Sequence, residues 1–169
     1  MTINKIDRIT VLATGGTIDK VYSLQGELEI GDPSVPQLLA PVLTDIEFTL
    51  ESVLRLDSLD MEDSHRAVLV NALEKVADNH IIITHGTDTM PETARYIHQY
   101  AQRENKVIVL CGAMQPASMR SSDAGFNFGM AVGAMNLLSP GVYICMSGKV
   151  FSAEEVHKDR SRGIFVSDQ

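Results

Sequence analysis

The chain has 169 residues, of which 44% are hydrophobic and 21% charged, and its formal net charge at pH 7 is -8. The composition excludes intrinsic disorder, and the length suits a single domain, residues 1–169, that buries roughly 70% of the surface of the unfolded chain. The negative charge and the lack of a basic stripe argue against nucleic acid and anionic membranes as partners, because both need clustered Lys and Arg.

The N-terminus and the cysteines indicate a reducing cytoplasm. Residues 1–8 are polar and lack the apolar core of a signal peptide, and no apolar run approaches the length of a membrane-spanning helix. Cys111 and Cys145 each lie within an apolar run, so we interpret them as small core residues rather than a disulfide or a metal pair. We therefore expect a cytoplasmic protein.

The first third of the chain predicts two strands with a small flap between them. Ile9–Ala13 is a short apolar run that leads into the sequence TGGT at residues 14–17. Its glycines permit positive φ and a close approach of the backbone to a ligand. Residues 21–30 suit a mobile flap or small hairpin, and residues 33–42 form a short helix at most. Ile46–Leu56 alternates apolar and polar side chains, which predicts a half-exposed strand.

The remainder alternates helices with uncharged strands. Helices are predicted from Met61 to about Asp78 or Asn79, from about Met90 to Arg103, and from Ser122 or Asp123 to about Leu138. The predicted strands between and after these helices are Ile81–Thr84, Val107–Leu110 and Gly141–Met146. This order predicts an α/β fold, a doubly wound and mostly parallel sheet with helices on both faces. Residues 149–169 form the most charged segment and are expected to be a docking tail or an interface.

The sequence HGTDT at residues 85–89 follows the most apolar strand directly. Thr89 and Glu92 have the spacing of a capping box, and Pro91 falls in the first turn of the following helix, where its missing N–H costs nothing. If Thr89 caps that helix, Thr87 and Asp88 are left without a structural task and are free for chemistry.

Polar clusters follow four predicted strands, at residues 14–17, 57–60, 87–89 and 112–115. Each cluster alone is explained by a turn or a helix cap. The carboxyl ends of parallel strands, however, lie on one edge of the sheet, where open α/β sheets bind their ligands. Their joint placement therefore predicts one site at this edge.

Threonine hydroxyls and a lysine suit acyl transfer from a small amide at this site. A threonine hydroxyl needs a base or a hydrogen-bonded partner to act as a nucleophile, and Lys158 is the candidate, although a lone lysine is more often a solvated surface charge. The histidines lack metal-ligand spacing; they are His65, His80, His85, His98 and His157. His85 is expected in the core or supporting the site. A Walker A loop is absent, although residues 14–17 could bind a phosphate with backbone amides.

The sequences TGGTI at residues 14–18 and HGTDTM at residues 85–90 resemble the two signature motifs of the bacterial-type asparaginase/glutaminase family. The resemblance continues through residues 57–61, 112–116 and 122–125 and covers nearly the whole chain. It implies the family's flavodoxin-like N-terminal domain. The implied activity is hydrolysis of the side-chain amide of L-asparagine to L-aspartate and ammonia, without a cofactor or a metal.

The same resemblance implies roles for individual residues. Thr17 is the nucleophile that forms an acyl-enzyme, with Tyr22 on the flap as its partner. Thr87, Asp88 and Lys158 form a second, triad-like group, in which Thr87 positions the attacking water and Lys158 shifts the proton. The implied substrate-binding residues are Gly16, Asp57, Ser58, Gly86, Asp88 and Ala113. Ser58 binds the α-carboxylate, Asp88 the α-amino group, and backbone amides near both threonines stabilise the oxyanion.

Three departures from the family pattern are visible. Family members are about twice as long, with a smaller C-terminal domain that completes a neighbouring subunit's site, so we expect a single-domain homo-oligomer, a dimer or tetramer, without that domain. Leu59 stands where many members have a polar residue, which leaves open an amidase for another small amide. The loop at residues 18–28 is shorter than in many members. The alternative function is a non-catalytic module that binds an amino acid or phosphate and lost turnover with the C-terminal domain.

Overall fold

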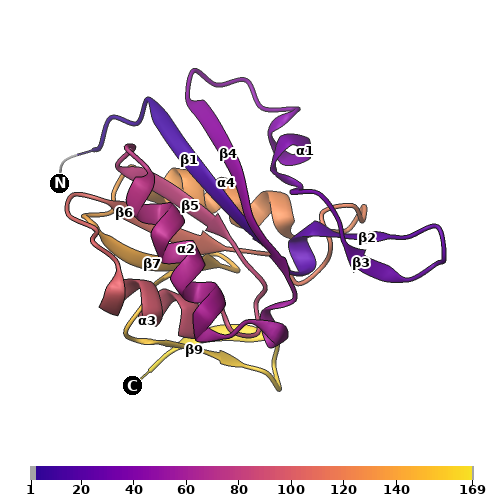
Figure 1. The fold of residues 1–169 in the computed structure, drawn as a ribbon. Helices are drawn as coiled ribbons and strands as arrows, with labels where there is room; N and C mark the ends of the chain where they lie inside the picture. The colour runs from indigo at the N-terminus through magenta and orange to yellow at the C-terminus, as the bar shows by residue number, and fades with distance from the viewer. Residues whose placement is uncertain (1–2, 169) are drawn as a thin grey trace.

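The computed structural model describes residues 3–168, which form a six-stranded sheet with helices packed on both of its faces (Figure 1). The strands in spatial order are β4 (Glu47–Leu56), β1 (Arg8–Gly15), β5 (His80–Thr84), β6 (Val107–Cys111), β7 (Gly141–Met146) and β8 (Lys149–Ser152). The first five are parallel to their neighbours, and β8 pairs antiparallel with β7. The predicted doubly wound, mostly parallel sheet is confirmed.

The order of the parallel strands reverses direction at β1. The chain runs from β1 to β4 on one side and then returns to β5, β6 and β7 on the other, which is the flavodoxin-like order. In such sheets ligands bind outside the carboxyl ends of the strands, at the point where the order reverses. That point lies between β1 and β5, whose carboxyl ends lead to Thr17 and Thr87.

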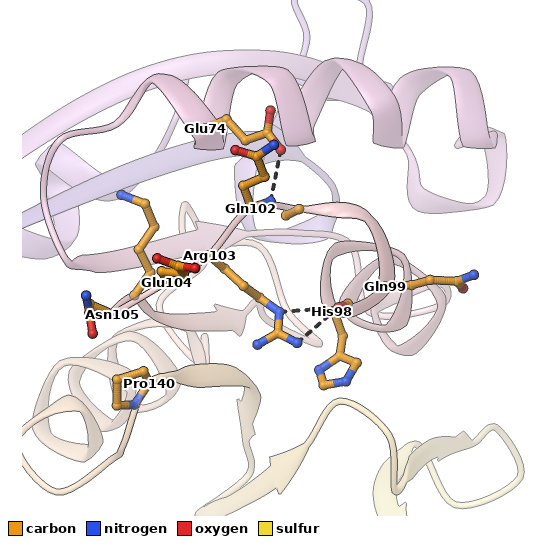
Figure 2. A pocket seen from close by; sticks show the side chains of 10 residues that line it. Glu74, His98, Gln99, Gln102, Arg103, Glu104, Asn105 and Pro140 are labelled. Carbon is orange, nitrogen blue, oxygen red and sulfur yellow. Dashed lines mark hydrogen bonds between the residues drawn. The ribbon is translucent and has the colours of Figure 1, made fainter.

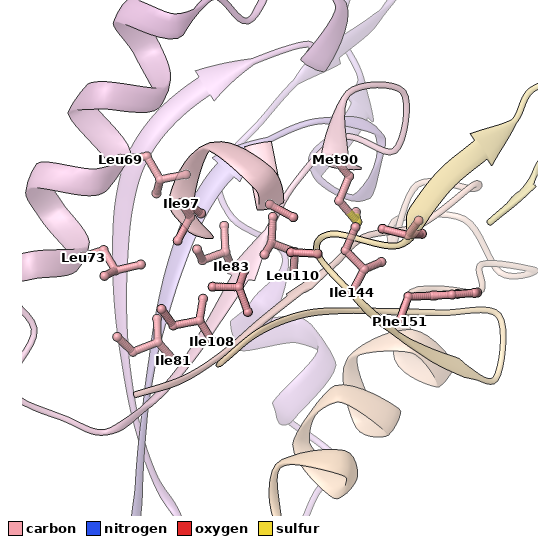
Figure 3. Close-up of a cluster of buried hydrophobic side chains, with 14 of the residues drawn as sticks. Leu69, Leu73, Ile81, Ile83, Met90, Ile97, Ile108, Leu110, Ile144 and Phe151 are labelled. Atoms are coloured by element: carbon pink, nitrogen blue, oxygen red, sulfur yellow. The ribbon is translucent and has the colours of Figure 1, made fainter. Parts of the chain in front are cut away.

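Two helices cover each face of the sheet. Helices α2 (Asp63–Lys75) and α3 (Met90–Tyr100) pack on one face, and α1 (Val35–Leu39) and α4 (Ala124–Met135) on the other. Figure 3 shows the larger core, in which Leu69, Leu73 and Ile97 lie against the strands. Ile81 and Ile83 belong to this core while Ile82 belongs to the opposite one. Strand β5 is therefore apolar without alternation because both of its faces are buried.

Helix ends differ from the predicted ones by a few residues. Helix α2 begins after Glu62, where a capping box with His65 satisfies the first turn, and ends at Lys75 rather than at Asp78. Asp78 instead accepts a hydrogen bond from Thr10 Oγ1 at 2.7 Å, which ties the following loop to β1. Helices α3 and α4 likewise end three residues before the predicted Arg103 and Leu138.

Two hairpins form separate two-stranded sheets beside the main sheet. β2 (Lys20–Tyr22) and β3 (Leu28–Ile30) pair antiparallel and project from the body, which confirms the predicted hairpin (Figure 1). β9 (Val156–Asp159) and β10 (Ile164–Ser167) form the second hairpin. The segment expected to be a docking tail therefore forms β8, β9 and β10 and packs onto the body, because Val156 and Phe165 are buried in the same core as β5. Gln169, the last residue of that segment, lies outside the described residues.

Cys111 and Cys145 are free and buried, as predicted for core residues. Burial raises the pKa of the Cys145 thiol to about 12 and raises the pKa of Cys111 as well, so both thiols stay protonated and unreactive. Among the helices of residues 3–168, none has the length and apolar character that crossing a membrane requires.

Candidate functional site

The turns after β1, β4 and β5 lie in close contact. Gly16 has φ of +82°, and a Cβ on it would lie 2.3 Å from the backbone nitrogen of Gly86. A Cβ on Gly86 would in turn lie 2.6 Å from the Oγ of Ser58. Only glycine fits at these two positions, since any side chain would separate the turns. The contacts bring the residues that follow the glycines, Thr17 and Thr87, to one place beside Ser58.

Lys158 joins the predicted pair Thr87 and Asp88 into one bonded group. Its Nζ donates to Thr87 Oγ1 at 2.9 Å and to Asp88 Oδ1 at 2.8 Å. The lysine side chain is 8% exposed and the aspartate side chain 33% exposed, while Thr87 is buried. The Lys158 ammonium is thus withdrawn from solvent and paired with the Asp88 carboxylate, which is still partly exposed to solvent. A buried charge requires such a partner.

The hairpin that carries Lys158 is anchored to the body from two sides. Val156 and Phe165 enter the main core, and Phe165 pairs with Lys158 across the hairpin. The guanidinium of Arg95, on α3, donates to the carbonyl of Val156 at 2.7 Å. Arg95 belongs to no recognisable motif, so the sequence alone did not predict this contact; only the pairing of distant segments exposes it.

Asp57 serves the turn that carries Ser58. Its Oδ1 accepts the backbone N–H of Leu59 at 3.1 Å, which caps the short 3-10 helix η2 (Ser58–Asp60), and its Oδ2 accepts Lys20 Nζ at 2.8 Å. The bond from Lys20 is the main reason that the pKa of Asp57 lies below its usual value, so the carboxylate stays ionised. Ser58 itself is buried, whereas Leu59 is exposed.

Thr89 occupies the position before α3, as predicted, but it does not form the predicted capping box. Its hydroxyl makes no cap bond and donates instead to the carbonyl of Ser58 at 2.7 Å. The Thr89 hydroxyl bonds to this carbonyl of the turn after β4 in place of the backbone N–H groups at the start of α3. Thr89 therefore ties the β4 and β5 turns together.

Thr17 and Tyr22 lie in consecutive elements at the start of the flap. Thr17 opens the short helix η1 (Thr17–Asp19) and is partly exposed, whereas Tyr22 lies on β2 with 67% of its surface exposed. Within residues 3–168 no hydrogen bond links the Tyr22 hydroxyl to Thr17. Their partnership stays a prediction.

Ala113 lies in the turn after β6, which packs against the β5 turn and beneath η1. A Cβ on Gly112 would lie 2.3 Å from the carbonyl oxygen of His85, so the two turns touch. Ala113 is buried in a small cluster with Ile18, the residue after Thr17. Asp123 accepts the backbone N–H of Met114 at 3.0 Å rather than capping α4. The predicted polar cluster at residues 112–115 thus packs against the turns that carry Thr17 and Thr87.

Two buried titratable residues flank these turns. His85 Nδ1 donates to the carbonyl of Gly86 at 2.7 Å, and its Nε2 lies 3.1 Å from the sulfur of Met61. Burial lowers the pKa of His85 to about 4, so it is neutral and structural. Burial also raises the pKa of Asp19 to about 6, although its carboxylate accepts the backbone N–H of Ser34 at 2.8 Å. Asp19 was not among the predicted site residues.

A hollow of about 770 Å³ lies elsewhere, near the amino ends of β6 and β7 (Figure 2). Its cations are already bonded within the chain: the Arg103 guanidinium donates to the carbonyl of His98, and Lys106 Nζ donates to the carbonyl of Val76 at 2.6 Å. It holds none of the predicted site residues, so we place the candidate site at the carboxyl edge. In the described part of the chain, no group of His, Cys, Asp and Glu could hold a metal.

Comparisons with known proteins show which family the chain and its fold match. A family model described as "Asparaginase, N-terminal" matches residues 8–165. The probable periplasmic L-asparaginase of Haemophilus influenzae is 34% identical over 170 residues, covering 94% of this chain and 48% of that protein. L-asparaginase 2 of Escherichia coli is 32% identical over 169 residues, with 94% and 48% covered.

The similarity extends to solved structures. The crystal structure of the probable cytoplasmic L-asparaginase from Campylobacter jejuni superimposes with a TM-score of 0.83 at 31% identity, covering 95% of this chain and 53% of the other. The chain spans about half the length of the curated relatives it matches.

Proposed function

Because the chain belongs to the asparaginase family, we propose that it is an amidohydrolase that cleaves the side-chain amide of L-asparagine through a threonine acyl-enzyme. The observation that carries this proposal is the group formed by Thr87, Lys158 and Asp88, whose bonds of 2.9 Å and 2.8 Å join segments about 70 residues apart. A buried ammonium on a threonine hydroxyl at a ligand-binding edge has no evident structural need. It suits proton transfer.

The first half of the reaction uses Thr17. Its hydroxyl oxygen attacks the amide carbon, a C–O bond forms, and the C–N bond breaks as the leaving nitrogen takes up the hydroxyl proton and departs as ammonia. Tyr22, on the hairpin above η1, is the proposed partner that assists this proton transfer. Backbone N–H groups next to Thr17 and Thr87 hold the negative oxygen of the tetrahedral intermediate.

The second half uses Thr87, Lys158 and Asp88. Because Lys158 donates to Thr87 Oγ1, the hydroxyl proton of Thr87 is free to point at a water molecule and position it against the acyl carbon. Water then adds its oxygen to the acyl carbon as the ester C–O bond to Thr17 breaks. The proton that the water loses passes by way of the Thr87, Lys158 and Asp88 group to the departing Thr17 oxygen, which regains its hydroxyl. Asparagine and water thereby become aspartate and ammonia, with no redox step and no cofactor.

Substrate binding uses the charges around the two threonines. Asp88 is one-third exposed and keeps an oxygen for the α-amino group of the substrate, while Ser58 offers its hydroxyl to the α-carboxylate. Gly16 and Gly86 are proposed to contact the substrate through their backbones, which the close approach of their turns brings to the site. Asp57 acts through the Ser58 turn, since its two oxygens already accept bonds from Leu59 and Lys20.

The proposed assembly is a homo-oligomer, a dimer or a tetramer, in the cytoplasm. A neighbouring copy that lies against the carboxyl edge would shield the acyl-enzyme from bulk water. The probable cytoplasmic relative from Campylobacter jejuni supports the location, and cell fractionation tests it against the periplasmic alternative that the Haemophilus influenzae relative represents.

Ammonia release from L-asparagine by the purified protein tests the proposed activity. We expect turnover in the wild type and none in Thr17→Ala or Thr87→Ala, with Thr49→Ala, an exposed threonine on β4, as the matched control. A folded wild-type protein that releases no ammonia contradicts the proposal. If L-aspartate or phosphate then still raises the thermal unfolding midpoint, the chain is a binding module instead.

A further inference from the structure

Lys20 connects the turn that carries Thr17 with the turn that carries Ser58. Its backbone N–H donates to the carbonyl of Thr17, closing η1. Its side chain reaches across to β4, where Nζ donates to Asp57 Oδ2 at 2.8 Å. Asp57 directly precedes Ser58, so the ammonium is bonded to the residue next to the one proposed to bind the carboxylate.

The position of Lys20 is fixed from the opposite side as well. Its carbonyl accepts a bond from Ser118 Oγ at 2.8 Å, and the neighbouring Ala117 N–H donates to the carbonyl of Ile18 at 3.0 Å. Lys20 therefore belongs to the rigid base of the β2–β3 hairpin and not to its projecting tip. A cation held at three points enters a complex with little loss of conformational freedom.

The ammonium of Lys20 retains hydrogen-bonding capacity. A lysine has three donors, and among the described residues Asp57 is the acceptor recorded for this one. Its side chain is 24% exposed, against 8% for Lys158, which spends two donors on Thr87 and Asp88. Of these two cations at the candidate site, Lys20 is the one that can still meet an anionic ligand.

We propose that Lys20 is a specificity-determining residue that binds the substrate's free carboxylate beside Ser58, so that the site selects small amides carrying such a carboxylate over neutral amides. This inference rests on the proposed amidohydrolase function. A charge-assisted bond to a fixed ammonium is roughly twice as strong as a neutral one, and an amide in place of the carboxylate would forfeit it. Asp57 orients the cation, and Ser58 supplies the second donor.

The experiment compares L-asparagine with asparaginamide, in which an amide replaces the α-carboxylate. Lys20→Met should raise KM for asparagine about 10- to 100-fold while kcat stays within about threefold, and should leave kcat/KM for asparaginamide unchanged. The control is Lys149→Met, an exposed lysine on β8, which should change neither. An unchanged KM overturns the inference, as does an equal loss on both substrates, because that indicates a purely structural role.

Calorimetric binding of L-aspartate separates this inference from the proposed function. If the wild type binds aspartate but releases no ammonia, the proposed function fails, and weaker aspartate binding by Lys20→Met still supports the role of Lys20. Equal affinities overturn it, and a wild type that neither binds nor turns over overturns both. Lys20→Gln, which can still donate to Asp57 without a charge, carries the same test if Lys20→Met does not fold.

Discussion

Gly86 occupies the space that a side chain on Gly16 would need: a Cβ on Gly16 would lie 2.3 Å from the backbone nitrogen of Gly86. This contact closes the switch point between β1 and β5 and sets the separation of the two threonines that follow. The signature glycines of the two motifs thus have one shared physical reason, which is the close approach of two turns.

Gly16→Ala should lower the free energy of unfolding by about 2 kcal/mol or more, because the new methyl group meets backbone atoms and the φ of +82° disfavours a side chain. The control is Gly129→Ala in α4, where a Cβ meets nothing within 4 Å. That change should stabilise the protein by up to about 1 kcal/mol through helix propensity. Urea unfolding of both variants measures the two effects, and a shared sign contradicts the assignment.

The sequence predicted what depends on local pattern. The continuous apolar run at Ile81–Ile83 marked a strand buried on both faces, and alternation marked the half-exposed β4; both are confirmed. The two glycine motifs located the edge that carries the candidate site. These features could be predicted from the sequence because each depends on residues that are close together in the chain.

Features that depend on distant segments were not readable. Thr89 and Glu92 have the spacing of a capping box, yet the Thr89 hydroxyl donates to the carbonyl of Ser58 in another turn. The segment 149–169 lacks a helix signal, and its short strands reveal themselves only through partners in the core. Arg95 and Asp19 act through backbone groups that no motif specifies.

Lys158→Met should reduce kcat for ammonia release by about 10²- to 10⁴-fold, the usual contribution of a proton-transfer group, while KM changes little. The folded state should survive with a loss on the order of 1–3 kcal/mol, since Asp88 loses its partner but remains one-third exposed. Initial rates and urea unfolding are the measurements. Lys149→Met serves as control, and a Lys158→Met protein with wild-type kcat would remove Lys158 from the mechanism.

Arg95→Met should loosen the hairpin that carries Lys158, because it removes the bond of 2.7 Å from the guanidinium to the carbonyl of Val156. Hydrogen exchange in β9 and β10 should become about tenfold faster or more, as expected from losing a charge-assisted bond, while exchange in β5 and β6 stays unchanged. The rate of ammonia release by Arg95→Met should fall as well, because the loosened hairpin carries Lys158.

The matched control for this change is Arg160→Met, an exposed arginine just after the end of β9. Equal exchange rates in the Arg95 variant and the wild type would show that core packing alone holds the hairpin.

Asp19→Asn should change the pH dependence of stability. Burial raises the pKa of Asp19 to about 6 in the folded state, against 3.8 for an unperturbed aspartate, so the folded state holds a proton between these values that the unfolded state has released. Wild-type stability attributable to this group is therefore complete below pH 4 and falls as the pH rises to 6 and above. Asparagine does not ionise and can still accept the Ser34 N–H.

The stability of Asp19→Asn relative to wild type should accordingly increase between pH 4 and pH 7, by on the order of 2 kcal/mol. His85 has the opposite slope, since its pKa of about 4 keeps it neutral where the unfolded state is charged, but its contribution is common to both proteins and cancels in the difference. Urea unfolding at pH 4.5 and 7.5 measures that difference, with Asp45→Asn, at an exposed loop position, as control. A difference that does not vary with pH would mean that the Asp19 carboxyl is not held protonated by burial.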